Sequence, residues 1–358
     1  MTVSDNGAGE LEALRRLSAT LGDDLALIQG AGGNTSLKIG DTLWIKASGT
    51  WLARARDRDI MVPVEMHPLL DAVHAVDPAA EKAEQFIIAA QAPPGLRPSI
   101  ETTVHALMPQ RVVLHVHCVN TIAIAVRKDA EGLLEPRLRG VNWALVPYAR
   151  PGLPLAHAIQ SVSGNRPDIL ILANHGLVVA AQTVDAAAVL LNDVVERLAS
   201  RPRTFAEPRI ERLQALASDT ANLAYRLPRT PEAHGIATDE ISIAHARQGS
   251  LYPDHVIFLE EGAPVAGAGE TPAEVAARLG KAPPFIVFPG LGVLMREDVP
   301  LNGDLMVQCL ADVAARIPAG APLRVLSARE HLDLTDWDAE KYRQELARAT
   351  SSAEARVP

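Results

Sequence analysis

The spacing of hydrophobic residues changes along the first part of the chain and predicts an alternation of helices and strands. Leucine recurs every three or four residues over 9–21, which is typical of an amphipathic helix. The runs TSLKI and TLWIKAS then alternate apolar and polar residues, and the dipeptide Gly40-Asp41 separates them. Two alternating runs joined by a two-residue turn predict a β-hairpin.

Longer apolar runs in the middle of the chain predict buried strands between helices. The segment 98–108 is predicted to be a helix with Ser99 as its N-cap. The β-branched run 112–119 is predicted to be a buried strand. A second buried strand, 168–173, passes through Asn-His-Gly into the apolar run LVVAA, and 184–200 has the pattern of an amphipathic helix. Helices that alternate with buried strands predict an α/β layered domain.

Composition changes after this last helix, and the change predicts a second domain. Residues 201–209 contain two prolines and three arginines, which is typical of a linker. Beyond the linker, the hydrophobic pattern predicts strands over 255–261, 284–295 and 323–327 and helices over 271–280 and 303–317. We therefore predict a first domain over 1–204 and a smaller α/β domain over 205–358.

Composition and charge narrow the class of protein. The chain has 358 residues, of which 48% are hydrophobic and 22% charged, the balance of a soluble globular protein. A formal net charge of −9 argues against a nucleic-acid partner, because duplex binding needs a basic surface. Two cysteines are too few for a disulfide framework and fit a reducing cytoplasm. The sequence shows neither a signal peptide nor an apolar run that would predict a membrane span.

Three histidines form the first candidate site. His115 and His117 are two residues apart in a predicted strand, so both rings project from one face. Two buried imidazoles are costly unless they share a partner, and a divalent cation, most simply zinc, is a natural one. His175 follows a buried strand at a glycine turn and supplies a third ligand, which leaves a coordination position open. The alternative is that these are ordinary strand and turn histidines.

Glu101 is the candidate catalytic group. It lies near the start of the predicted helix, where a carboxylate is favoured by the exposed N–H groups and the helix dipole. A carboxylate beside a polarised carbonyl can act as a general base, or ligate the metal when no substrate is present. The alternative is a glutamate that only stabilises the start of its helix.

The glycine-rich segment GAGGNTS at 30–36 is a candidate binding loop. It is not a dinucleotide fingerprint, because a hairpin follows it instead of a helix, and it lacks the lysine of a P-loop. Its backbone N–H groups could cradle an anion, unless the segment is merely a tight turn that needs glycine. The substrate- or phosphate-binding candidates around it are Asn34, Thr35, Ser36, Ser48, Gly49 and Ser99.

Taken in order, GAGGNTS, KASGT, PSIE, HVH and NHG resemble the class II aldolase and adducin family over about residues 10–200. The resemblance implies a three-layer α/β/α domain in which His115, His117 and His175 hold zinc and Glu101 is the acid/base. Phosphate contacts would fall on Asn34, Ser48, Gly49 and Ser99. Ile100 stands where the common phosphate-binding motif has a second serine, so one phosphate donor is missing.

The implied function is reversible aldol cleavage of a small hydroxy-carbonyl compound through an enediolate. The same site could instead serve an epimerase, dehydratase or decarboxylase, and a non-catalytic binding protein or a phosphate-binding module remains a further alternative. Adducin-like members lack the metal ligands, so the three histidines favour an enzyme. The resemblance also implies a homo-oligomer, a tetramer or dimer, in which a neighbouring subunit could supply a tyrosine such as Tyr148 or Tyr252.

Overall fold

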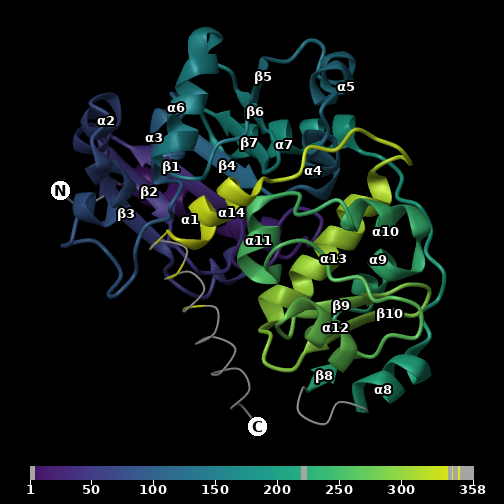
Figure 1. Cartoon of the computed structure of the whole chain (residues 1–358). Coiled ribbons are helices and arrows are strands. Elements are labelled where there is room, and N and C mark those ends of the chain that lie inside the picture. Colours follow the sequence, from purple (N-terminus) through teal and green to yellow (C-terminus); the bar gives the residue numbers. More distant parts are fainter. Residues whose placement is uncertain (1–4, 219–223, 338–340, 342–345, 347–358) are drawn as a thin grey trace. The chain divides into compact units, whose positions relative to one another are not determined.

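The computed structural model describes residues 5–218, 224–337, 341 and 346 of the chain (Figure 1). Contacts divide the chain into two compact units. The first consists of Met1–Ala125 and Ala130–Ala199, and the second of Val126–Asp129 and Ser200–Pro358. The main division therefore falls five residues before the predicted domain boundary at 204/205, and a short segment from the middle of the chain joins the second unit.

The first unit is built on a seven-stranded sheet with the order β3-β2-β1-β4-β7-β6-β5. All neighbouring strands run antiparallel except β5 and β6, which are parallel. The strands are β1 (Asn34–Ile39), β2 (Thr42–Lys46), β3 (Met61–Glu65), β4 (Val112–Val116), β5 (Trp143–Val146), β6 (Ile169–Leu172) and β7 (Gly176–Ala181).

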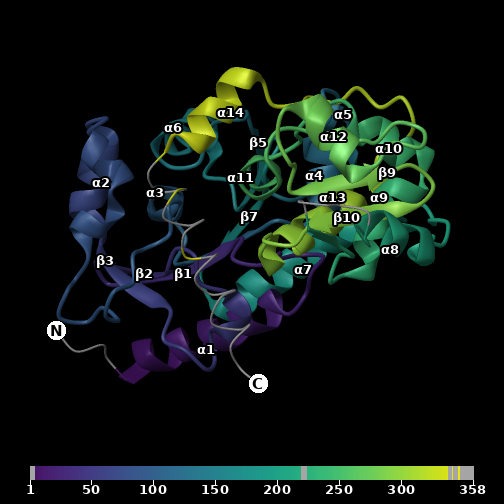
Figure 2. The same cartoon turned by 60° about the horizontal axis from the view of Figure 1, so that its bottom comes forward.

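Helices cover both faces of this sheet, as Figure 2 shows for α1 below the strands and α3 and α6 above them. On one face the sheet packs against α1 (Asp5–Gly22), α4 (Val119–Ala125), α5 (Ala130–Arg137) and α7 (Val184–Leu198). On the other face it packs against α2 (Met66–His74), α3 (Thr102–Leu107) and α6 (Leu153–Val162). The predicted three-layer α/β/α architecture is confirmed.

The hairpin forms as predicted, but the strand predicted over 112–119 and the helix predicted over 98–108 are shorter than expected. The strand β4 ends at Val116, so His117 lies outside it, and helix α4 begins at Val119. Ile39 pairs with Thr42 across a two-residue turn, which confirms the β-hairpin. Helix α3 begins only at Thr102, and Ser99 is not its N-cap. The Ser99 hydroxyl accepts a hydrogen bond from the backbone N–H of Glu101 at 3.2 Å, so it stabilises the turn that precedes the helix.

The second unit combines a three-stranded antiparallel sheet, in the order β8-β10-β9, with seven α-helices among its described residues. The strands are β8 (Tyr225–Arg226), β9 (Phe285–Phe288) and β10 (Gly292–Arg296). The helices are α8 (Ile210–Ser218), α9 (Gly235–Thr238), α10 (Glu240–Ala246), α11 (Pro253–Leu259), α12 (Pro272–Leu279), α13 (Leu301–Arg316) and α14 (Ala328–Thr335). Across the described part of the chain, no helix is long and apolar enough to cross a membrane.

Two predicted strands of this unit are wrong. The segment 255–261 lies mostly in α11, because Pro253 at the first helical position and Asp254 in the first turn favour a helix start over a strand. The segment 323–327 is not a strand, and only Leu323 forms an isolated β-bridge, to Arg127. Both runs are short and apolar, and periodicity alone does not distinguish a strand from a buried helical turn at that length.

Candidate functional site

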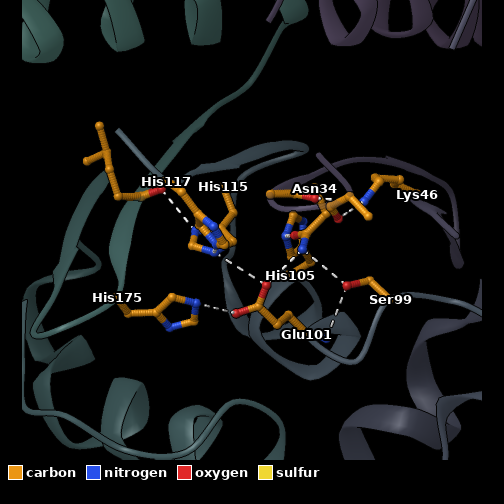
Figure 3. Close-up of polar contacts among 11 residues, drawn as sticks. Asn34, Lys46, Ser99, Glu101, His105, His115, His117 and His175 are labelled. Atoms are coloured by element: carbon orange, nitrogen blue, oxygen red, sulfur yellow. Dashed lines mark hydrogen bonds and ion pairs between the residues drawn. The ribbon is translucent and has the colours of Figure 1, made fainter. Parts of the chain in front are cut away.

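Three histidine rings converge at the end of the seven-stranded sheet where β4 and β6 have their carboxyl ends (Figure 3). His115 lies on β4, His117 follows it, and His175 lies in the turn between β6 and β7. Their ring centroids are 4.9–5.3 Å apart, and one ligand atom from each ring lies within 4.8 Å of the others. All three side chains are buried. The structure therefore brings the predicted ligands together.

The local backbone explains why these rings meet. Asn174 adopts a left-handed conformation with φ of 53°, which asparagine tolerates better than most residues, and this closes the turn that carries His175. Gly176 opens β7 directly beside the other two histidines. A Cβ atom at Gly176 would lie 2.6 Å from the backbone oxygen of Val116, 3.2 Å from the His115 ring and 3.4 Å from the His117 ring. Glycine is thus required here for space.

Substituting Gly176→Ala should therefore disturb the histidine cluster itself. The added methyl group must displace backbone or rings, and overpacking of this kind typically costs about 1–3 kcal/mol of folding free energy. We expect a lower urea midpoint and weaker binding of added zinc by calorimetry. Gly132→Ala in α5, where no atom lies within 4 Å of the new Cβ, should leave zinc binding unchanged and serves as the control. Equal zinc affinity in both variants would contradict this account of Gly176.

Glu101 completes the cluster from the residue just before α3. Its Oε2 lies 3.3 Å from His115 Nε2 and its Oε1 lies 3.4 Å from His175 Nε2. Burial alone would raise the pKa of this carboxyl. The three imidazoles and the amide of Asn34 outweigh that effect and lower the pKa to about 2. The carboxylate is therefore ionised at neutral pH.

The arrangement fits a divalent cation. His115 Nε2 and His117 Nε2 face each other at 3.2 Å, so the two nitrogens must share either a proton or a cation. His115 Nδ1 lies 3.1 Å from the backbone oxygen of Leu177, and donation to that oxygen leaves Nε2 free to act as a ligand. Three imidazoles with one adjacent carboxylate form a donor set that suits a divalent cation and leaves a position for a further ligand.

The predicted binding residues are only partly brought to this site. Asn34 pairs with His115 across β1 and β4, and its Nδ2 donates to Glu101 Oε2 at 2.8 Å and to Ser99 Oγ at 3.1 Å. Ser48 lies on the chain segment next to Ser99, because an isolated β-bridge joins Ala47 and Pro98. Gly49, with φ of 73°, follows Ser48 in the same loop.

The structure does not bring the Thr35 side chain to this site. Side chains alternate along β1, so Thr35 faces the opposite side of the sheet from Asn34. Its hydroxyl lies 2.7 Å from Ser18 Oγ of α1, where both are buried. The Thr35 side chain therefore stabilises the packing of α1 on the sheet.

Two buried residues that the sequence analysis did not identify support the site. Lys46 at the end of β2 donates to the backbone oxygens of Ala31 and Gly33 at 2.9 and 3.0 Å, which fixes the glycine-rich loop. His105, one helical turn after Glu101, lies between Ser36 and Asn34. The signal for His105 was present, since residues four apart share one face of a helix.

His105 fixes the orientation of Asn34 and, through it, of Glu101. Burial and the nearby His115 lower the pKa of His105 to about 3, so its ring is neutral at physiological pH. The Asn34 Oδ1 atom can only accept, so His105 Nε2 carries the proton and donates to it. His105 Nδ1 then accepts from the hydroxyl of Ser36 at 2.7 Å. This tautomer turns the Asn34 amide nitrogen toward the carboxylate.

Replacing His105→Phe should loosen Asn34 while leaving the metal ligands in place. The change leaves Asn34 Oδ1 and the Ser36 hydroxyl buried without this partner, at a typical cost of about 1–3 kcal/mol for each unsatisfied group. We expect a lower urea midpoint with metal still bound. His74→Phe, at an exposed position of α2, is the control. In the wild-type protein, ¹⁵N spectra that show a proton on His105 Nδ1 instead of Nε2 would contradict the assigned tautomer.

Tyr148 and Tyr252 were the two tyrosines that a neighbouring subunit could supply to the site, and the structure places them in different surroundings. Tyr148 follows β5, whose carboxyl end lies beside that of β6 and hence at the sheet edge that carries His175. Tyr252 is only 2% exposed and contacts Cys309 in the core of the second unit. A tyrosine buried in this way cannot reach a neighbouring subunit, so Tyr252 is excluded as a candidate.

Comparison with known proteins gives the family. The family model for the class II aldolase and adducin N-terminal domain matches residues 12–200, which are more than half of the chain. The uncharacterized oxidoreductase YuxG of Bacillus subtilis (strain 168) is 29% identical over 187 residues, which cover 48% of this chain and 27% of that protein. The chain thus spans about a quarter of the length of this relative.

Solved structures with a similar arrangement include the N-terminal class II aldolase domain of a conserved protein from Thermoplasma acidophilum. It is 24% identical, covers 55% of this chain and 93% of its own, and has a TM-score of 0.46. The l-fuculose-1-phosphate aldolase from Thermus thermophilus is 19% identical, covers 53% and 92% respectively, and has a TM-score of 0.35. On the match of the family model, the chain belongs to the class II aldolase and adducin family.

Proposed function

We propose that this chain is a metal-dependent aldolase-type lyase that reversibly cleaves a small hydroxy-carbonyl compound, a sugar or a sugar-phosphate-like molecule. One observation carries the proposal: three buried imidazoles and an ionised carboxylate converge at one sheet edge. A divalent cation such as zinc, held by His115, His117 and His175, would act there as a Lewis acid toward the substrate carbonyl.

Glu101 has the position and the protonation state of a general base. In the direction of bond formation, the ionised carboxylate takes a proton from the carbon next to the donor carbonyl, which leaves an enediolate. That carbon then forms a bond to the aldehyde carbon of the acceptor, and the aldehyde oxygen receives the proton that Glu101 took from the donor carbon. Cleavage is the reverse, in which protonated Glu101 returns the proton to the enediolate carbon.

Asn34 and Ser99 hold the carboxylate in place from the side opposite the histidines (Figure 3). Asn34 binds Oε2, and Ser99 Oγ accepts both from Asn34 and from the Glu101 backbone N–H. Ser48 and Ser99, on adjoining segments, are the groups that would bind the polar end of the substrate. With Ile100 in place of a second serine, this end offers one hydroxyl donor fewer for a phosphate.

A substrate panel tests the proposal. The zinc-loaded chain is incubated with hydroxy-carbonyl compounds of three to six carbons, each with and without a terminal phosphate, and aldehyde release is measured. We expect cleavage of at least one compound, its loss with a chelator, and its restoration by zinc. Products that keep the whole carbon skeleton, or release of carbon dioxide, would replace the aldolase assignment with epimerisation, dehydration or decarboxylation.

A further inference from the structure

A pocket of about 690 Å³ lies within the second unit. Its lining comes from α8, from Arg247 at the end of α10, from the loop 266–270 and from the turn between β9 and β10. We propose that this pocket binds a small organic phosphate, a phosphate monoester with an apolar or aromatic body. The inference goes beyond the proposed function, since every lining residue belongs to the second unit.

Two arginines give the pocket a positive charge that the described residues do not neutralise. Arg212 of α8 and Arg247 both line it and are exposed, and neither forms an ion pair or a side-chain hydrogen bond with any residue that the structure describes. Guanidinium groups match the geometry of phosphate oxygens, and charge-assisted hydrogen bonds of this type are stronger than neutral ones.

The single carboxylate of the lining is already occupied. Glu270 accepts from Arg278 Nε at 2.8 Å and Nη2 at 2.9 Å, and from the backbone N–H of Gly267 at 2.7 Å. The hydrogen bond from Arg278, with that from Gly267, lowers the pKa of Glu270 to about 2. Glu270 and Arg278 therefore form a neutral pair, and the charges of Arg212 and Arg247 remain for a ligand.

The loop and the floor of the pocket fit a phosphate and a small apolar group. Gly269 has φ of +74°, and among the described residues the backbone N–H groups of Ala268 and Gly269 have no hydrogen-bond acceptor. Unpaired N–H groups on such a glycine turn are typical of anion sites. Apolar side chains of the lining, which include Leu216, Phe288 and Leu291, offer contact to the body of the ligand. The volume lies in the range of small-molecule sites, about 300–1,000 Å³.

The test uses phenyl phosphate as the probe and the full metal-loaded chain. Backbone amide resonances are followed by NMR, so binding near Ala268 and Gly269 is distinguished from binding near Ser48 and Ser99 of the candidate active site. We expect the Ala268 and Gly269 resonances to shift with phenyl phosphate and not with phenol. The double variant Arg212→Gln/Arg247→Gln should weaken this binding at least about tenfold, as the loss of charge-assisted hydrogen bonds implies.

Two further variants separate a built pocket from general surface charge. Ala215→Phe fills the pocket from α8 and keeps both arginines, and it should abolish the shifts. Arg58→Gln/Arg201→Gln removes two exposed arginines that do not line the pocket, and it should leave the affinity unchanged. The proposal is overturned if the loop amides do not shift, if phenol shifts them equally, or if both double variants lose the same affinity.

Discussion

Replacing His115 and His117 together with alanine should release the metal ion and abolish turnover. The two residues carry two of the three imidazole groups whose ligand atoms lie within 4.8 Å of one another. Changes to groups outside the first coordination sphere already cost about 10–100-fold in metal affinity, so the removal of two ligands should cost more. His175 and Glu101, left alone, cannot provide a site of three protein ligands.

Metal analysis of purified protein measures this directly. After growth and dialysis with zinc, the wild-type chain should retain about one ion, as one three-histidine site implies, and the double variant close to none. His67→Ala/His74→Ala removes two exposed histidines of α2 and is the matched control, with the metal content of the wild type. Zinc should also raise the melting temperature of the wild type, because a ligand that binds only the folded state stabilises it.

Two results would contradict the metal site. One is a double variant that retains stoichiometric zinc, which would place the ion elsewhere in the chain. The other is a wild-type chain that binds no divalent metal at any tested concentration. In that case the three rings would share protons instead, and a non-catalytic member of the family would be the better description.

The sequence predicted that the three histidines meet, but strand periodicity accounts for only part of this. Residues two apart share one face of a strand, whereas β4 ends at Val116 and His117 lies just beyond it. The third ligand follows from topology, since β4, β6 and β7 are neighbours in the sheet and the β6–β7 turn reaches the same edge. The number of residues between Glu101 and the histidines, by contrast, does not indicate how close they lie in the folded chain. Only the family resemblance implied that they meet.

The structure differs from the predictions for Thr35 and Ser99, and in both cases the side chain contacts a residue that is distant in the sequence. Thr35 was grouped with Asn34 because they are adjacent in sequence, but adjacent strand residues face opposite sides of a sheet. Its partner Ser18 lies on α1, and no local pattern predicts that pairing. Ser99 was predicted as an N-cap from residue type alone. Its hydroxyl instead binds Asn34, a contact between residues 65 apart in the sequence.

Glu101→Gln should reduce turnover by about 10²–10⁴-fold, the range typical of general acid/base catalysis. Glutamine has almost the shape of glutamate and can still accept the hydrogen bond from Asn34, but its amide cannot take up a proton from carbon. Because His115, His117 and His175 remain, the variant should keep its metal ion. Loss of rate with retained metal would separate proton transfer from metal binding.

Hydrogen exchange in deuterium oxide isolates the step assigned to Glu101. A hydroxy-ketone donor incubated with the wild-type chain, without an aldehyde acceptor, should exchange the hydrogen next to its carbonyl for deuterium. Glu101→Gln should lose this exchange in proportion to its loss of turnover, because both depend on one proton transfer. His74→Phe, at an exposed position of α2, should retain the exchange of the wild type. Exchange by Glu101→Gln at the wild-type rate would assign the base to another group and leave Glu101 a role in the coordination of the metal.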